Sequence, residues 1–376
     1  MSLRIGVDGR ELRAGVRTGI RRYVLEVLRA AATRGLACVV YGDGQTRFGD
    51  MPPDVISCVL SARWTQWWDQ VALPAALRRD GVGAFLSPYY KRPLAAPCPV
   101  VVTIHDLFFI GYPGRRRPLY DAAMTRLARL YAQGASAIIA DSEHSRRAIV
   151  ARLGIAADRI VVIPVGLGPE FRPATPTAAQ RERYGLGLRY ALYVGNFLPH
   201  KNLSRLLRAW SALAAPLRAG HRLVLAGGDQ SRRPALAALA DSLGLADAVV
   251  LPGLVDDADL PALYGGATLV VQPSLEEGFG LPALEAMACG APVVASRRGA
   301  LPEVVADAGL LVDPEDEHAL AAALARVLVS ADERAALTRR GLARAGDFTA
   351  ERTAGRVVDV LQATAGLRPA LSGSGS

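Results

Sequence analysis

Two glutamates are the residues of this sequence whose type and spacing most clearly point to chemistry. Glu277 and Glu285 stand eight residues apart within a stretch that contains several glycines and prolines, residues 272–290. A carboxylate accepts hydrogen bonds from two hydroxyl groups at once, so this pair suits the diols of a sugar and of a ribose. The structural alternatives are a helix-capping or helix-dipole role for Glu285 and simple solvation of Glu277 on a loop.

The stretch around the two glutamates also predicts a phosphate-binding helix terminus. A buried strand runs into a glycine-bearing loop, Pro282 stands where the first turn of a helix accepts proline, and Gly290 is placed to end that helix. The free backbone N–H groups of such a terminus attract phosphate. A diol, a diphosphate and a second diol together make a nucleotide sugar, which is the ligand that this pattern predicts.

Lysine is rare in the chain, because Lys91 and Lys201 are the only two among 44 basic residues. Lys201 lies between a strand-like and a helix-like run, where a compact positive charge could neutralise a diphosphate leaving group. His105 closes another apolar run, and there it could bond a sugar hydroxyl or pass a proton. The alternatives are a lysine left by chance and a histidine with a structural role only.

Two further patterns give weaker signals. Residues 15–22 form a glycine-bearing turn that opens a helix and could approach a ligand closely. Asp257 and Asp259 resemble a metal-binding Asp-x-Asp motif, but they precede a helix and are more simply an N-cap cluster. We therefore predict no metal. The four cysteines are widely spaced and suggest neither a zinc site nor a disulfide framework.

The elements that must position these residues alternate in the order strand, helix, strand. β-branched runs recur between Ala-, Leu- and Arg-rich stretches of helical period in both halves of the chain. This alternation predicts an α/β fold with two doubly wound, Rossmann-like domains built on parallel sheets. We expect an N-terminal acceptor-side domain at 1–170, a linker at 171–189, a nucleotide-sugar-binding domain at 190–348, a last helix at 349–366 and a disordered tail at 367–376.

Composition restricts the class of protein further. The 376 residues are 51% apolar and 21% charged, with a mean hydropathy of +0.20, which excludes a disordered chain and a single small module. Neither a signal peptide nor a membrane span is expected, and the cysteine usage makes a reducing cytoplasm the default compartment. The dinucleotide fingerprint and the Walker A loop are both missing from the sequence, so a nicotinamide dehydrogenase is disfavoured.

The basic excess of the chain lies in its first half. There are 24 basic and 14 acidic residues up to Thr175, against 20 and 21 in the remainder. This half, which also holds Trp64, Trp67, Trp68 and the cluster 115–117, could face an anionic acceptor or an acidic membrane surface. Nucleic acid is not expected, because no RNA- or DNA-binding pattern accompanies the charge. The alternative is a solvated arginine-rich surface.

Several segments resemble a known family, the retaining GT-B-fold glycosyltransferases of family 4, also called group 1. In the second half these are YVGNFLPHKNLSRLLRAW, VVLPGLVDDADLPALYGGA and EEGFGLPALEAMACGAPVVAS. In the first half TGIRRYV, WWDQVALP and TIHDLFFIGYP resemble the mannosyltransferase-like branch. The resemblance implies two domains that face each other across a cleft and a last helix that crosses back to the first domain.

The resemblance also assigns roles to residues. It implies that Glu277 contacts the donor hexose, Glu285 the ribose, Lys201 the donor phosphates and His105 the sugar. Further donor contacts would come from backbone and apolar groups of Gly19, Leu254, Gly278, Phe279, Gly280 and Leu281.

One position departs from the family pattern. Asn196 follows the glycine of the YVG strand, where many members carry arginine. Positive charge could come instead from His200, beside Lys201, and leaving-group stabilisation would then be more sensitive to pH than with an arginine.

The sequence thus predicts a retaining, metal-independent glycosyltransferase of polysaccharide biosynthesis. It would move a hexose, mannose from GDP-mannose, onto a glycan or lipid-linked acceptor in the cytoplasm, with peripheral contact at an anionic membrane as an open option. One alternative is a UDP-sugar-dependent glucosyl- or N-acetylglucosaminyltransferase or epimerase of the same fold. The other is a nucleotide-sugar-binding protein without turnover. No motif encodes the acceptor or the oligomeric state.

Overall fold

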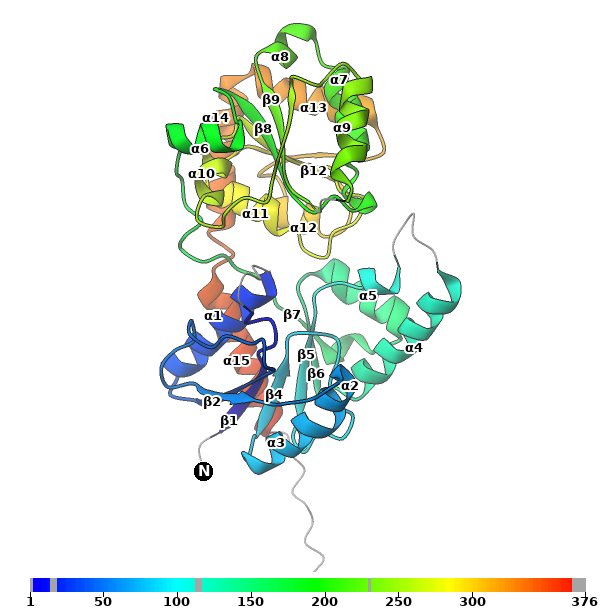
Figure 1. The fold of residues 1–376 in the computed structure, drawn as a ribbon, viewed down its shortest axis with the longest axis vertical. Coiled ribbons are helices and arrows are strands. Elements are labelled where there is room, and N and C mark those ends of the chain that lie inside the picture. Colours follow the sequence, from blue (N-terminus) through cyan, green and yellow to red (C-terminus); the bar gives the residue numbers. More distant parts are fainter. Residues whose placement is uncertain (1–2, 14–18, 112–116, 229–230, 367–376) are drawn as a thin grey trace, which may run out of the picture. The chain divides into compact units, whose positions relative to one another are not determined.

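The computed structural model describes residues 3–13, 19–111, 117–228 and 231–366 of the chain. Two compact units are present (Figure 1). The first comprises the chain up to Ile110, Arg117–Gly166 and the residues from Ala350 onward, and the second is built on Leu167–Thr349. The predicted tail at 367–376, the turn residues 15–18 and the arginines 115 and 116 lie outside the described residues.

The first unit contains a parallel sheet of seven strands in the order β3-β2-β1-β4-β5-β6-β7. The strands are β1 (Arg4–Asp8), β2 (Ala37–Gly42), β3 (Ile56–Val59), β4 (Ala84–Ser87), β5 (Val100–Ile104), β6 (Ala137–Ala140) and β7 (Ile160–Val162). The α-helices are α1 (Gly19–Thr33), α2 (Thr65–Trp67), α3 (Leu73–Arg79), α4 (Pro118–Gln133), α5 (Glu143–Leu153) and α15 (Ala350–Gly366).

Both faces of this sheet are covered by helices, which is why its strands are almost continuously apolar. Along β5, Val100, Val102 and Ile104 pack into the core formed with α3, α4 and α5. Val101 points to the opposite face, into the core formed with α1 and α15. Helix α15, from the end of the chain, lies beside α1 (Figure 1).

The second unit contains a parallel sheet of six strands in the order β10-β9-β8-β11-β12-β13. The strands are β8 (Tyr190–Gly195), β9 (Arg222–Gly227), β10 (Val249–Gly253), β11 (Leu269–Gln272), β12 (Val293–Ser296) and β13 (Leu310–Val312). The α-helices are α6 (Ala178–Tyr184), α7 (Leu203–Ser211), α8 (Ala215–Ala219), α9 (Arg233–Ser242), α10 (Leu260–Gly265), α11 (Leu281–Ala288), α12 (Leu301–Val305), α13 (Glu317–Val329) and α14 (Ala331–Ala345).

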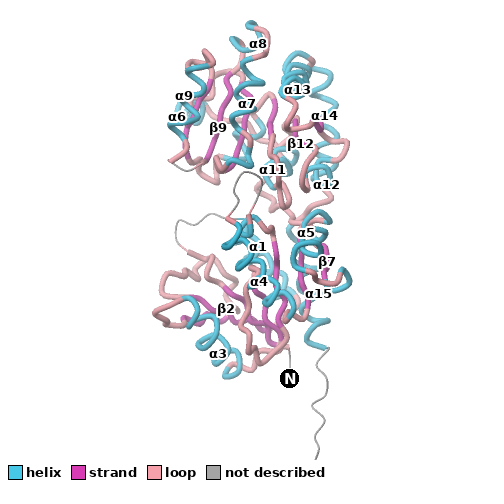
Figure 2. The backbone as a smooth tube through the Cα atoms, turned by 90° about the vertical axis from the view of Figure 1, so that its right-hand side faces the viewer, coloured by secondary structure: helices cyan, strands magenta, loops and turns pink. Residues whose placement is uncertain are grey.

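Helices lie on either side of the strands in both units, as a doubly wound fold requires (Figure 2). Helix α7 illustrates how the sequence produces this layer. Leu203, Leu206, Leu207 and Trp210 recur at helical spacing and are buried against the sheet, while Arg208 is exposed. The two Rossmann-like units of the predicted GT-B fold are therefore confirmed.

The predicted linker at 171–189 is in part a structured element of the second unit. It contains α6, which begins with a capping box between Thr177 and Gln180. The Gln180 amide and the Tyr184 hydroxyl each donate to the Asp259 carboxylate at 2.6 Å. Asp259 is the N-cap residue of α10, as predicted, but its side chain caps no N–H of that helix and joins α6 to α10 instead.

Short elements were not predicted, because three to seven residues carry too little periodicity. Strands β3, β4 and β13 and helices α6, α8 and α12 belong to this group. Strand β3 is an edge strand whose residues are mostly exposed, so it also lacks an apolar pattern. None of the helices in the described part of the chain is both long and apolar enough to cross a membrane.

The packing of α15 into the first unit predicts a large effect of Leu361, which is fully buried. Leu361→Ala leaves a cavity in the core between α1 and the sheet, and we expect it to lower the free energy of unfolding by about 2 to 5 kcal/mol. Leu119→Ala on α4 is the matched control, because Leu119 is 89% exposed. Urea unfolding followed by circular dichroism measures the stability of both variants. Equal unfolding midpoints would contradict the burial of Leu361 in this core.

Candidate active site

Lys201 is positioned by a tight turn after β8. It ends a single turn of 3₁₀ helix, Pro199–Lys201, and the next residue, Asn202, has the left-handed backbone conformation with φ of 61°. The Asn202 side-chain amide donates to the backbone carbonyls of Pro273 at 3.1 Å and Pro314 at 2.7 Å. These bonds fix the lysine-bearing turn to the loop after β11.

Glu277 lies on that loop and forms an ion pair with Lys201. The Lys201 Nζ atom is 2.7 Å from Glu277 Oε1, and the Ser274 hydroxyl donates to the same oxygen at 2.7 Å. The two charged side chains are only 11% and 8% exposed. Because both charges are buried and hydrogen-bonded, each holds the other in one orientation. The sequence predicted both residues in the site but not their direct contact.

The backbone behind Glu277 is closely packed. The Ala300 N–H donates to the Glu277 carbonyl at 3.0 Å, and the Leu275 N–H donates to the His200 carbonyl at 2.7 Å. Gly299 has a φ of 64°, and a Cβ atom at this position would lie 2.5 Å from the Glu277 nitrogen. Glycine is therefore required here by both backbone conformation and space.

Helix α11 begins directly after this loop, as the sequence predicted. Gly280, with φ of 105°, is its N-cap residue, and Leu281 and Pro282 form the start of the first turn. Gly280 has no side chain with which to cap the helix start, Pro282 has no N–H, and the Ala283 N–H donates to the Gly280 carbonyl at 3.1 Å. The Leu281 N–H and the positive end of the helix dipole are therefore what this terminus offers to an anion. The Phe279 ring is buried edge-on against Phe348, with ring centroids 6.0 Å apart, which leaves the backbone of this loop to face a ligand.

Glu285 is the fifth residue of α11 and is 8% exposed. The Tyr264 hydroxyl, from α10, donates to its Oε2 atom at 2.8 Å. Glu285 is thus held by a tertiary hydrogen bond rather than acting as a helix cap. Sequence reasoning assigned no role to Tyr264 or to Ser274, because a tyrosine or a serine without a neighbouring base gives no catalytic signal by itself.

The remaining donor-site candidates of the second unit have different environments. Gly278 lies between Glu277 and Phe279 on the same loop. Asn196 is exposed, and its side-chain oxygen accepts from the Leu198 N–H at 3.2 Å. Leu254 follows β10 and is 80% exposed. An apolar side chain so exposed is available for contact with a planar base.

The prediction that His200 replaces the missing arginine as a positive charge is wrong for the unliganded chain. Burial, with the neighbouring Lys201 ammonium, lowers the pKa of His200 to about 4. The imidazole is therefore neutral near pH 7, and Lys201 carries the positive charge of this turn.

Two candidates belong to the first unit. His105 follows β5, and its Nδ1 atom lies 2.7 Å from the Oδ2 atom of Asp141, which follows β6. Parallel neighbours end at the same sheet edge, which is why these side chains meet. Although burial opposes the charged form, the Asp141 carboxylate raises the pKa of His105 above its ordinary value. Gly19 is exposed and opens α1.

Metal-ligating side chains are not clustered in the described part of the chain. No group of three His, Cys, Asp or Glu residues is close enough there to hold an ion. The carboxylate of Asp259 is engaged by Gln180 and Tyr184.

Comparison with known proteins assigns the chain to a family. Residues 177–344 match the group 1 glycosyl transferases, and residues 17–171 match glycosyltransferase family 4. The O-antigen chain mannosyltransferase B of Escherichia coli is 36% identical over 254 residues, which cover 67% of each chain. The chain belongs to the group 1, family 4 glycosyltransferases, and it is an enzyme of that class.

Three further proteins are similar to this chain, one in sequence and two in structure. The serotype-specific mannosyltransferase WbdA of Escherichia coli is 31% identical over 271 residues, 69% of this chain but only 32% of that protein. Sucrose-phosphate synthase of Thermosynechococcus elongatus has a similar structure, with a TM-score of 0.80 and 23% identity over 96% of this chain and 98% of that chain. HepE of Anabaena, solved with UDP and glucose, has a TM-score of 0.76 and 20% identity over 96% of this chain and the whole of that one. These structures share the GT-B fold.

The close contact between Gly299 and Glu277 predicts a loss of activity that stability does not explain. Gly299→Ala and the control Gly244→Ala place a side chain at nearly the same φ, 64° and 67°, but only the first meets a neighbour. The left-handed conformation alone should cost about 1 to 2 kcal/mol of stability in either variant, and Gly299→Ala should cost more because its Cβ meets the Glu277 backbone. Only Gly299→Ala should also lower turnover, by about 100-fold, because it displaces Glu277. Equal turnover in the two variants would contradict this account of the loop.

The His105–Asp141 contact predicts a pH-dependent stability. Because the pKa of folded His105 is raised above 6.5, the pair stabilises the fold fully below pH 6.5, and this stability is lost as the pH rises through the raised value. Asp141→Asn should lower the histidine pKa and cost about 1 to 3 kcal/mol at acidic pH, with a smaller cost at alkaline pH.

Histidine NMR titration and chemical unfolding measure these two effects. His221, whose pKa is lowered by burial in the second unit, is the internal control and should not respond. An unchanged His105 titration in Asp141→Asn would refute the assigned cause.

Proposed function

We propose that this enzyme transfers mannose from GDP-mannose to a glycan or lipid-linked acceptor, with retention at the anomeric carbon and without a metal ion. The observation that carries the proposal is the buried Lys201–Glu277 pair beside the uncapped start of α11. It places one fixed positive charge, one fixed negative charge and the positive end of a helix dipole at one edge of a parallel sheet.

Each part of this arrangement suits one part of a nucleotide sugar. The Leu281 N–H with the dipole of α11, and the Lys201 ammonium, would hold the diphosphate. Glu285, oriented by Tyr264, would accept from the ribose hydroxyls. Glu277 would accept from the sugar and stabilise the positive charge that develops on the anomeric carbon.

Transfer then needs no enzymic nucleophile. The bond between the anomeric carbon and the diphosphate oxygen breaks, and the acceptor oxygen bonds the same face of that carbon. The acceptor proton passes to the departing phosphate, whose growing charge Lys201 neutralises. Glu277 is a positioning and electrostatic group, and His105 bonds a sugar hydroxyl.

The choice of mannose rests on relatives, and the choice of GDP rests on the resemblance to the mannosyltransferase-like branch alone. The O-antigen chain mannosyltransferase B and WbdA are both named mannosyltransferases, and the first matches over two thirds of either chain. WbdA is about three times as long as the matched region, so the activity of the whole of WbdA is not assigned to this chain. A cytoplasmic location and peripheral contact with an anionic membrane stay predictions.

The proposal predicts selective nucleotide binding that does not need Glu277. Calorimetric titration with GDP, UDP, ADP and dTDP in the presence of EDTA should give tightest binding for GDP. Because glutamine keeps an oxygen that can accept from the Lys201 ammonium, Glu277→Gln should leave GDP affinity within about threefold, but the lost charge should lower mannosyl transfer by about 100-fold or more. Glu315→Gln, an exposed carboxylate paired with Arg298, is the matched control and should change neither.

The possible outcomes separate the candidates. Tightest binding of UDP would replace GDP-mannose by a UDP-sugar donor. Nucleotide binding without sugar transfer or donor hydrolysis would indicate a binding protein. Loss of GDP affinity and transfer to the same extent in Glu277→Gln would contradict the role given to Glu277.

A further inference from the structure

The first unit contains a pocket that the reaction at Lys201 and Glu277 does not explain. Its volume is about 480 Å³, within the range that holds small organic ligands. Its wall is formed by the segments that follow four parallel strands: Arg10 and Glu11 after β1, Asp43 after β2, 62–65 after β3 and 89–91 after β4. The carboxyl ends of parallel strands are where such sheets bind ligands.

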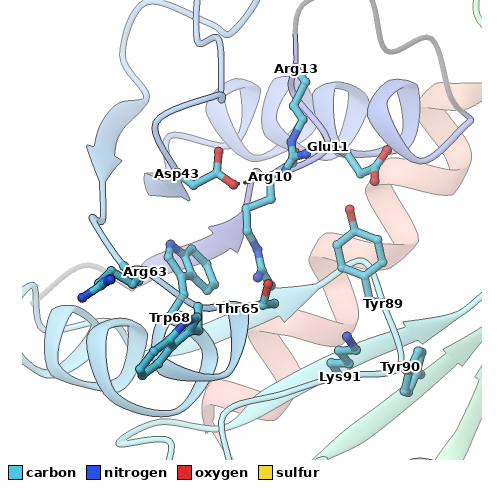
Figure 3. A pocket seen from close by; sticks show the side chains of 12 residues that line it. Arg10, Glu11, Arg13, Asp43, Arg63, Thr65, Trp68, Tyr89, Tyr90 and Lys91 are labelled. Atoms are coloured by element: carbon cyan, nitrogen blue, oxygen red, sulfur yellow. Dashed lines mark hydrogen bonds and ion pairs between the residues drawn. The ribbon is translucent and has the colours of Figure 1, made fainter.

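Arg10 forms a rigid centre of this pocket. Its guanidinium lies 2.6 Å from Asp8 Oδ2 and 2.8 Å from Asp69 Oδ1. It also stacks on the Trp68 ring, with Cζ 3.8 Å from the ring centroid. Figure 3 shows Arg10 between Trp68 and Arg63 on one side and Tyr89, Tyr90 and Lys91 on the other.

A π-helical turn makes this arrangement possible. Residues Trp68–Ala72 adopt it between α2 and α3, and both Trp68 and Asp69, although adjacent in sequence, reach Arg10. The π-helical turn is rare and occurs frequently at functional sites. The wall of the pocket therefore depends on this π-helical turn, an irregularity that packing of the helix alone would not require.

Two cations of the pocket differ from the others. Arg10 and Arg13 are paired with carboxylates, Arg13 with Asp43 at 2.9 Å. Lys91 and Arg63 form no ion pair with any described residue; Lys91 lies 5.7 Å from the Tyr90 ring and Arg63 6.0 Å from the Trp64 ring. The Lys91 charge also acts on the Asp69 carboxylate, which Arg10 already engages. Lys91 is also one of the only two lysines in the chain, and the other is Lys201 of the candidate active site. Two cations that form no ion pair among the described residues favour a ligand with negative charge.

The aromatic and polar groups of the pocket suit a sugar ring. The Trp64 side chain is 67% exposed, and the Tyr90 ring is held in place by stacking on Phe109, with centroids 4.1 Å apart. Exposed aromatic faces cover the apolar faces of sugar rings, and nearby carboxylates and hydroxyls can bond their hydroxyl groups. Glu11 and Tyr89 supply such groups on the pocket wall.

We propose that this pocket binds a saccharide unit that carries a negatively charged group, a phosphate or a carboxylate, as part of the acceptor. Trp64 and Tyr90 would contact the ring, and Lys91 and Arg63 would contact the charged group. This inference deepens the proposed function. It rests on that function where it calls the bound saccharide an acceptor, whereas the binding itself can be measured without any donor.

The test is calorimetric titration of the full chain, without nucleotide, with four probes: mannose 6-phosphate, glucuronic acid, mannose and inorganic phosphate. At least one charged sugar should bind about tenfold or more tightly than mannose and than phosphate, because it uses both parts of the pocket. The stronger of the two charged sugars identifies phosphate or carboxylate as the group. Higher salt should weaken this binding.

Three variants assign the binding to the pocket. Lys91→Ala and Trp64→Ala should each weaken it by about tenfold or more. Arg78→Ala removes the same charge from the exposed end of α3, outside the pocket, and should leave it unchanged. Thermal unfolding of each variant verifies that the chain is folded.

Several results would overturn the proposal. One is the absence of saturable binding of either charged sugar up to about 10 mM. The others are equal affinity for mannose and the charged sugars, a loss of affinity in Arg78→Ala equal to that in the pocket variants, and binding of anionic lipid vesicles alone. GDP titration of the same samples separates the two proposals. If GDP binds and the sugars do not, only the pocket assignment fails; if the sugars bind and no nucleotide does, the donor assignment fails.

Discussion

The buried ion pair between Lys201 and Glu277 is the interaction on which the rest of the second unit depends. Two opposite charges with side chains about a tenth exposed lose most of their hydration, so they need a fixed partner and further hydrogen bonds. Ser274 supplies one such bond. Removing either charge alone from such a pair costs about 3 to 5 kcal/mol. The surrounding backbone is accordingly arranged to hold both side chains in place.

That arrangement uses glycine and asparagine where no other residue fits well. Asn202 adopts a left-handed conformation and joins the lysine turn to two neighbouring loops through its amide. Gly299 lets a second loop approach the Glu277 backbone closely, and Gly280 starts α11. These loops all follow the carboxyl ends of strands, so the parallel sheet brings a cation, an anion and a helix terminus together without a continuous motif.

Much of the fold and part of the site could be predicted from the sequence. Alternating apolar runs predicted both parallel sheets, and the spacing of Glu277, Pro282 and Gly290 predicted the loop and α11. The contact of Glu277 with Lys201 joins residues 76 positions apart in the sequence. A local sequence pattern carries no information on which residues meet across such a separation. Their placement in one site came from the family resemblance.

Other features depended on tertiary packing and were missed for that reason. The low pKa of His200 follows from burial, which a sequence does not display. The bond from Tyr264 to Glu285 joins two helices, and the bond from Gln180 to Asp259 joins a predicted linker to the second unit. The pocket around Arg10 joins four loops and a π-helical turn. The sequence pointed toward it only through the scarcity of lysine and through the tryptophans in the basic first half of the chain.

The central claim, that Lys201 and Glu277 act as one unit on the donor, is tested most directly by a double-mutant cycle on kcat/KM for sugar transfer. The variants are Lys201→Met, Glu277→Gln and the combination. Each single change should lower kcat/KM by about 100-fold or more, and the double variant should be close to the poorer single one, because either change already disrupts the pair. A double variant whose loss equals the product of the two single losses would show that the two groups act independently and would contradict the account.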